Sequence, residues 1–160
     1  MITILRISTE ETLPLRSHIL REGRPFEECR FAQDELPGAF HLGAIHAERL
    51  AGIATFSPVA LENLPGRGYQ LRGMAVDGAV QRGGIGRLLL LAGEERLSVV
   101  GDVHYVWCNA RIAACNFYLR NGFKFVSEVF DIPTVGPHRR MIKWLRPMPE
   151  GFSANSSSAH

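Results

Sequence analysis

The stretch QRGGIG, Gln81 to Gly86, places three glycines within four positions, next to Arg82 and Arg87. The leucine-rich residues that follow predict a helix. The residues before it, Tyr69–Val76, are apolar on both faces and predict a central strand. A helix start is a ready anion site, because its first N–H groups have no intrahelical partner and the macrodipole adds partial positive charge. The turn therefore predicts a phosphate or pyrophosphate site.

Other glycine-rich motifs fit this stretch poorly. A plain tight turn, with glycine needed only for positive φ, is the main alternative, since short glycine motifs often match by chance. No Gly-Lys-Ser/Thr follows, so the stretch is not a Walker A loop. A dinucleotide fingerprint fails because its third glycine would fall on Leu89.

The remaining chain predicts alternating strands and helices. Strands are expected at Thr3–Ser8, Ala39–Ala47, Leu50–Pro58, Val103–Ala110, Phe123–Phe130 and His138–Leu145, with helices at Thr9–Glu22, Gly84–Val99 and Ile112–Asn121. The order β-α-β-β-β-α-β-α-β-β indicates an α/β fold with helices on both faces of one mixed sheet. We expect a single domain over residues 1–146 and a C-terminal tail, 147–160, that is disordered at its end.

Composition limits the classes of partner. The net charge of the 160 residues is +2, too small to argue for a nucleic-acid or membrane partner, although 16 of the 18 basic residues are arginine. No signal peptide and no membrane-spanning stretch is recognised. The three cysteines lack CxxC spacing and predict reduced, buried thiols in a cytoplasmic protein. The histidines lack zinc-ligand spacing, so no metal site is expected.

Two motifs resemble the GNAT superfamily of acyl-CoA-dependent N-acetyltransferases. Gln81-x-x-Gly84-x-Gly86 is similar to the family's Q/R-x-x-G-x-G/A signature, and a strand ending in MAV precedes it. The segment NARIAACNFYLRNGF, Asn109–Phe123, resembles the family's N-x-x-x-x-A-x-x-F-Y-x-x-x-G-F pattern. The resemblance implies a mixed, mostly antiparallel sheet that splays at its fourth and fifth strands.

The resemblance also implies where acetyl-CoA would bind. Backbone N–H groups from Arg82 to Arg87 would hold the pyrophosphate, while the two arginine side chains could equally face solvent. The end of the central strand would hold the pantetheine arm, and the Val76 N–H would polarise the acyl carbonyl and stabilise the oxyanion formed by amine attack. The implied coenzyme-binding residues are Met74, Ala75, Val76, Gln81, Arg82, Gly83, Gly84, Ile85, Gly86, Arg87, Asn109 and Asn116.

Catalytic residues are also implied, each with an alternative. Tyr118 matches the tyrosine that protonates the leaving thiolate in many members, or it is a core aromatic. Asn109 either binds the coenzyme or caps the next helix. His138, expected where the loop before the last strand ends, is a candidate at the acceptor site or a surface residue. No general base is evident, and a water chain could replace one.

The expected function is transfer of an acetyl group from acetyl-CoA to an amine of a small molecule or peptide by direct attack. Cys108 and Cys115 are interpreted as packing residues, so no covalent intermediate is expected. The alternative is a non-catalytic acyl-CoA-binding or regulatory module, and a nucleotide-phosphate binder is less favoured. The helix from Thr9 and the loop Arg24–Gly38 are expected to wall the acceptor site, and their mixed charge leaves the acceptor's charge open. The oligomeric state is also open, a homodimer included.

Overall fold

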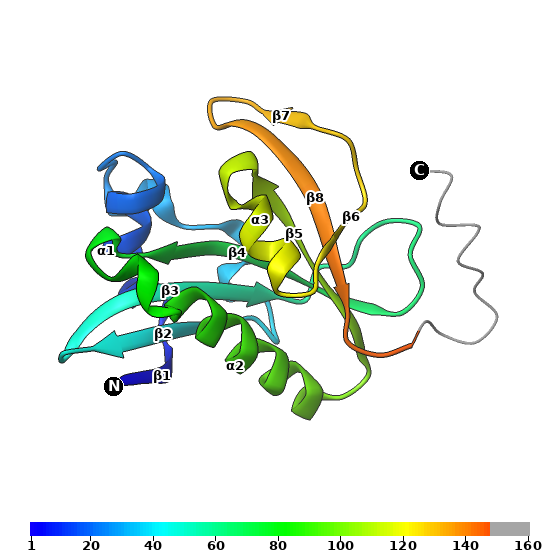
Figure 1. Ribbon diagram of the computed structural model, residues 1–160, viewed down its shortest axis with the longest axis horizontal. Coiled ribbons are helices and arrows are strands. Elements are labelled where there is room, and N and C mark those ends of the chain that lie inside the picture. Colours follow the sequence, from blue (N-terminus) through cyan, green and yellow to red (C-terminus); the bar gives the residue numbers. More distant parts are fainter. Residues whose placement is uncertain (148–160) are drawn as a thin grey trace. The chain divides into compact units, whose positions relative to one another are not determined.

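Figure 1 shows a computed structural model of the chain, which describes residues 1–147; for Gln81 and Arg82 it describes the backbone only. The strands are β1 (Ile2–Ile7), β2 (Phe40–His46), β3 (Arg49–Ser57), β4 (Arg67–Val76), β5 (Val103–Arg111), β6 (Lys124–Phe125), β7 (Phe130–Ile132) and β8 (Gly136–Trp144). The longer helices are α1 (Thr9–Leu15), α2 (Ile85–Val100) and α3 (Cys115–Arg120). Short helical turns are η1 (Arg16–Leu20), η2 (Phe26–Cys29), η3 (Ala32–Glu35), η4 (Gly78–Gly83) and η5 (Ile112–Ala114).

The strands follow the order β1-β2-β3-β4-β5-β8-β6, and β7 pairs with β8. The pairs β1–β2, β2–β3, β5–β8, β6–β8 and β7–β8 are antiparallel. β4 pairs with β5 in parallel over Arg67–Gln70. The mixed, mostly antiparallel sheet with a central β4 is therefore confirmed.

The chain divides into two compact units, and β4 passes from one to the other. Unit 1 comprises Met1–Pro58 and Leu71–Val99, and unit 2 comprises Val59–Gln70 and the residues from Val100 on. The single domain expected over residues 1–146 stays a prediction. The expected tail lies outside the described residues, apart from Pro147. Within the described part, no helix is long and apolar enough to cross a membrane.

In unit 1, β3 directs alternate residues to two faces, as the period of a strand requires. On one face Ile53 packs with Ile7 and Ala75, against Leu15, Ile19, Leu20 and Leu50. On the other face lies α2, which Figure 1 shows crossing β2 and β3. Helices thus cover both faces of the sheet in this unit.

Two glycines let α2 approach the sheet closely. A Cβ on Gly52 of β3 would lie 2.7 Å from the Ile85 side chain, and one on Gly93 of α2 would lie 2.1 Å from the Phe56 ring. The buried residues of α2, namely Ile85, Leu89, Leu90, Gly93 and Leu97, form one helical stripe. The start of α2 is therefore fixed against β3 by tight packing.

The first helix begins as expected and ends earlier. The Ser8 side chain accepts from the Glu11 N–H, and the Glu11 side chain accepts from the Ser8 N–H, a capping box. Pro14 within α1 cannot donate a helical hydrogen bond. After Leu15 the helix continues as the π-helical turn η1, so the helix predicted to Glu22 ends at Leu20.

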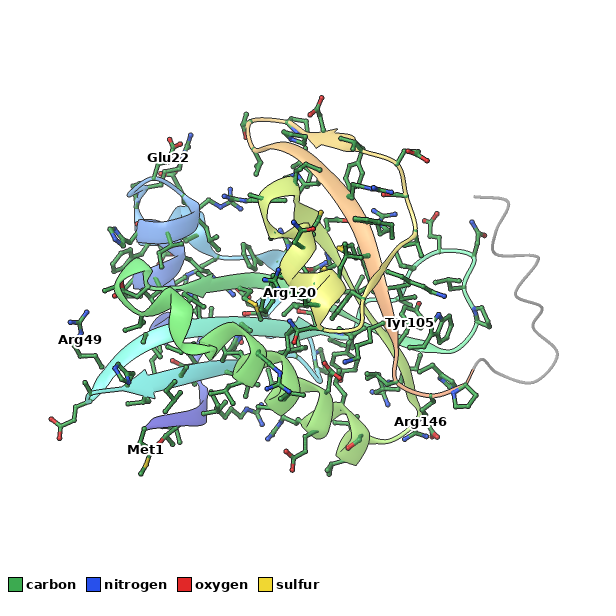
Figure 2. All side chains as sticks on the ribbon, in the orientation of Figure 1. Met1, Glu22, Arg49, Tyr105, Arg120 and Arg146 are labelled. Atoms are coloured by element: carbon green, nitrogen blue, oxygen red, sulfur yellow. The ribbon has the colours of Figure 1, made fainter. Side chains whose placement is uncertain are left out.

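Unit 2 has its own core around β5. Tyr105, Trp107 and Ile142 pack with Val59, Leu61, Leu64, Val126 and Trp144. The Tyr105 hydroxyl accepts from the Leu61 N–H at 2.8 Å, and the Trp107 indole donates to the Val59 carbonyl at 2.7 Å; Figure 2 marks Tyr105. These bonds tie the segment before β4 to β5.

The strand expected at Phe123–Phe130 is wrong. Two short strands, β6 and β7, pair with β8 instead. Between them the Ser127 hydroxyl accepts from the Arg140 N–H at 2.8 Å, and the Ser127 carbonyl accepts from the Arg139 guanidinium. Side-chain bonding thus replaces strand pairing at this point.

Candidate active site

The glycine turn in unit 1 joins β4 to α2. η4 ends at Gly83 and is followed by Gly84, which has a left-handed backbone with φ of +76°; α2 begins one residue later than predicted. The Leu88 N–H donates to the Gly84 carbonyl at 3.1 Å, which closes the first helical turn. A Cβ built on Gly83 or Gly84 would meet nothing within 4 Å. The turn therefore has one open side, and its positive φ accounts for the glycine at position 84.

The N–H groups of Ile85, Gly86 and Arg87 start α2 and have no acceptor one turn back within the helix. The helix has 16 residues, long enough for its dipole to favour an anion at this end. Ile85 is buried and anchors the turn, whereas the Arg87 side chain is exposed. The geometry suits a phosphate group.

Asp77 holds the beginning of the turn, a role that the sequence interpretation missed. Its side chain accepts from the Ala79 N–H at 3.0 Å, and its own N–H donates to the Ala51 carbonyl at 2.8 Å. Arg49, labelled in Figure 2, lies 3.4 Å from the carboxylate. An aspartate directly before a helical turn is a favoured cap, a signal available in the sequence.

The three residues implied for the pantetheine arm end β4. Ala75 is buried in the core with Ile7 and Ile53, and Met74 and Val76 are half-buried. Gly73, just before them, has φ of +62°, which interrupts the regular alternation of the strand. These residues and the turn are consecutive parts of unit 1.

Tyr118 lies on α3 in unit 2 and is buried. Its ring meets Phe117 and Phe123 edge to face, with centroids 5.1 and 5.2 Å apart. Burial raises the pKa of the hydroxyl well above its ordinary value, and Cys108 and Cys115 add to the rise. The hydroxyl therefore stays protonated, as a proton donor requires, and the ring is also a core aromatic.

The two asparagines lie in different settings of unit 2. Asn109 lies within β5, and its side-chain carbonyl accepts from the Arg140 Nε–H at 3.0 Å. It caps no helix, because β5 runs on to Arg111, so that alternative is wrong. Asn116 is exposed in the first turn of α3.

His138 is buried within β8 and not at its start, so its interpretation as a surface residue is wrong. β8 begins at Gly136, two residues earlier than predicted, because β5 and β7 both pair with this end. The Nδ1 atom lies 2.7 Å from the Gly136 carbonyl oxygen. A carbonyl oxygen only accepts, so Nδ1 carries a hydrogen, and in the neutral ring the lone pair is on Nε2.

Cys108 and Cys115 are free and buried. Burial raises the pKa of both thiols, and the rise is largest for Cys108. A thiol that stays protonated is a poor nucleophile, so their interpretation as packing residues is confirmed.

A buried polar network in unit 1 has no counterpart in the sequence interpretation. Arg16 is fully buried, and its guanidinium donates to both oxygens of Asp34 at 2.9 and 2.8 Å. It also donates to the Cys29 carbonyl and the Thr55 hydroxyl. Arg16 lies 18 residues from Asp34 and 39 from Thr55, so no local spacing could have joined them.

The network continues through His41. Its Nδ1 lies 2.8 Å from the Thr55 hydroxyl and its Nε2 lies 3.0 Å from the Thr9 hydroxyl, which donates to Glu35 at 2.7 Å. Because Thr9 donates to Glu35, its oxygen accepts from Nε2–H, and Nδ1 accepts from Thr55. Burial lowers the pKa of His41 below its ordinary value. Burial thus favours the neutral ring, and these hydrogen bonds select one tautomer of it.

Comparison with known proteins identifies the family of this chain. The profile of the acetyltransferase (GNAT) family matches residues 5–123. The chain belongs to this family. Over 91% of its length and 98% of the relative's it is 38% identical to the uncharacterized N-acetyltransferase YitI of Bacillus subtilis. It is therefore an acetyltransferase, and the expected recognition and enzyme class are confirmed.

Solved structures share the fold. An aminoglycoside 6'-N-acetyltransferase complexed with coenzyme A aligns with a TM-score of 0.72 at 16% identity, over 92% of this chain and 99% of that one. The ribosomal-protein-S18-alanine N-acetyltransferase of Escherichia coli aligns with a TM-score of 0.67 at 23% identity, over 96% and 99%. The expected GNAT-like fold is confirmed.

Proposed function

We propose that this acetyltransferase uses acetyl-CoA and transfers the acetyl group to an amine of a small molecule or peptide by direct attack. The observation that carries the proposal is the open glycine turn at the start of α2. The space at the Cβ positions of Gly83 and Gly84 is open, and the first three N–H groups of α2 follow the turn. This arrangement fits the pyrophosphate of a coenzyme.

The chain's own residues take the following roles in the proposal. The N–H groups from Arg82 to Arg87 hold the pyrophosphate, and the end of β4, Met74–Val76, holds the pantetheine arm through its backbone. Acetyl-CoA supplies an activated acyl group. Tyr118 donates a proton to the departing sulfur, and His138 takes one from the acceptor amine through its Nε2 lone pair. Asn109 and Asn116 add polar contacts to the coenzyme.

Thiol release from acetyl-CoA in the presence of amines tests the proposal. The amine panel contains amino acids, amino-acid amides, a polyamine and short peptides, and propionyl-CoA replaces acetyl-CoA in a parallel series. We expect amine-dependent thiol release and an acetylated product detected by mass spectrometry. Tight binding of acetyl-CoA with no amine-dependent release would instead support the non-catalytic acyl-CoA-binding module.

A further inference from the structure

Three arginines of unit 1 gather around one aromatic ring. The guanidinium carbon of Arg16 lies 3.9 Å from the centre of the Phe31 ring, that of Arg72 lies 4.2 Å away and that of Arg21 6.0 Å away. We call these four residues the arginine cluster. They come from η1, the segment after it, the loop before η3, and β4.

Only one of the three arginines is neutralised. Arg16 is matched by Asp34, at 2.8 Å with both side chains buried. Arg21 and Arg72 have no carboxylate partner among residues 1–147. The one hydrogen bond described for the Arg72 side chain goes to the Gln33 carbonyl at 3.1 Å. The cluster therefore carries unmatched positive charge.

The acidic residues nearby have other partners. Glu28 pairs with Arg24, and Arg30 pairs with Glu27 and Glu10, all on exposed side chains. The Glu35 carboxylate accepts from the Thr9 hydroxyl. Glu22 is exposed at the outer end of the segment that carries Arg21, as Figure 2 shows. In the sequence, the mixed charge of this region leaves the charge of the acceptor undetermined. In the structure, these pairs cancel most of that mixed charge.

The environment makes the unmatched charge costly. Arg72 is half-buried, and burial lowers its pKa, helped by the charges of Arg21 and Arg16 and opposed by the smaller effect of Asp34. Half-buried positive charges in excess of their counter-ions destabilise a fold, so an excess of this kind favours a ligand of opposite sign.

Gly73 brings the cluster against β4. It has φ of +62°, and a Cβ there would lie 2.9 Å from the Phe31 ring and 3.3 Å from Arg16 Nε. This buried Nε has no hydrogen-bond partner. Arg72 is two residues before Met74, and Met74 begins the segment of β4 that is proposed to hold the pantetheine arm. The unmatched charge thus lies beside the proposed transfer site.

Resting on the proposed function, we propose that Arg21 and Arg72 bind a carboxylate of the acceptor, so that the substrates are amines that carry a carboxylate, such as amino acids or short peptides. The guanidinium fork matches a carboxylate with two parallel hydrogen bonds. Phe31 supplies an apolar surface for the carbon chain between the carboxylate and the amine. A polyamine would meet repulsion at the same place.

The kinetic test compares amines that carry a carboxylate with their carboxamide counterparts, in the wild-type enzyme and in arginine variants. The acceptors are 4-aminobutyrate and 4-aminobutanamide, L-alanine and L-alaninamide, and 1,4-diaminobutane. In the wild-type enzyme we expect kcat/KM for at least one carboxylate to exceed that for its carboxamide about 10-fold or more, since hydrogen bonds to charged groups are the strong ones. In Arg72→Gln we expect this ratio to fall to about 2 or less. In Arg72→Lys we expect a value between those of wild type and Arg72→Gln.

Differences in amine basicity cancel when the ratio is compared between enzyme forms. Arg21→Gln should reduce the ratio as well, and Arg6→Gln, an exposed arginine of β1, should leave it unchanged. The melting temperature of each variant shows whether it is folded. Equal carboxylate-to-carboxamide ratios in wild type and Arg72→Gln, or 1,4-diaminobutane as the best acceptor, would overturn the inference.

A binding test separates this inference from the proposed function. Succinate is titrated into the protein without acetyl-CoA, and the arginine Nε–H resonances are followed by NMR. We expect saturable shifts of Arg72 and Arg21 in wild type and about 10-fold weaker binding in Arg72→Gln. Absence of acetyl transfer to every amine would reject the proposed function, whereas unsaturable shifts, or equal binding in Arg72→Gln, would reject the carboxylate site.

Discussion

At the scale of single residues, Tyr118 combines packing with a proton that it does not lose. Its pKa is raised by burial, so it is a donor throughout the neutral range. Tyr118→Phe keeps both edge-to-face ring contacts and removes the hydroxyl alone. We predict that kcat falls about 100-fold while acetyl-CoA affinity and melting temperature change little.

Steady-state kinetics and thermal unfolding on one purified preparation check this. Phe117→Leu is the matched control, because it removes one ring contact of Tyr118 and leaves the hydroxyl. We expect Phe117→Leu to lower the melting temperature and to change kcat little. Normal turnover in Tyr118→Phe would remove the tyrosine from the mechanism and leave it as a core residue.

His138 has a tautomer set by the Gly136 carbonyl, with Nε2 as the acceptor. We predict that His138→Gln lowers kcat about tenfold or more and leaves acetyl-CoA affinity unchanged, because the residue acts on the acceptor. Turnover and calorimetric titration measure the two effects, with the exposed His18→Gln as control. Wild-type pH–rate profiles in His138→Gln would contradict this role.

At the scale of elements, the turn and the start of α2 act as one anion site. Gly83 has open space around its Cβ position, so a side chain fits there without strain. A side chain at Gly84 would strain the backbone, since φ of +76° disfavours every residue except glycine. Gly83→Glu should lower acetyl-CoA affinity about 100-fold, because a carboxylate occupies the pyrophosphate position.

Gly83→Gln is the matched control, with nearly the same shape and no charge. In calorimetric titration we expect the Kd of Gly83→Gln for acetyl-CoA to rise by less than about 10-fold, compared with about 100-fold for Gly83→Glu. Unchanged binding in the folded Gly83→Glu variant would mean that the coenzyme is held elsewhere.

At the scale of the whole molecule, the buried network links pH to global stability. The pKa of His41 is lowered by burial, so the unfolded chain takes up a proton at about pH 6.5 while the native ring stays neutral. The contribution of His41 to stability is therefore complete above pH 6.5 and is lost as pH falls below it. We predict a decrease in the free energy of unfolding between pH 6.5 and 5.

Urea unfolding of wild type and His41→Gln across this range checks the prediction. The variant should be less stable at pH 7 and show a flatter pH dependence, because glutamine does not titrate. His18→Gln, at an exposed position, should keep the wild-type slope. Equal slopes in wild type and His41→Gln would contradict the assignment.

Features that depend on neighbouring residues can be predicted from the amino-acid sequence alone. The Ser8–Glu11 capping box, the hairpin of β2 and β3, the central β4 and the glycine turn before α2 all follow from local spacing and periodicity. The glycine turn is predictable because φ at Gly84 and the orphan N–H groups of a helix start are local properties.

The contacts between side chains that are distant in the sequence depend on how the elements pack in three dimensions. Arg16, Asp34, His41 and Thr55 form one network across segments that pattern analysis assigns to a helix, a loop and two strands. The pairing of β8 with β5 and β7 buries His138, and the approach of Phe31 to Gly73 leaves Arg72 half-buried. These contacts depend on burial, and burial is set by how the elements pack and not by the order of residues within any one of them.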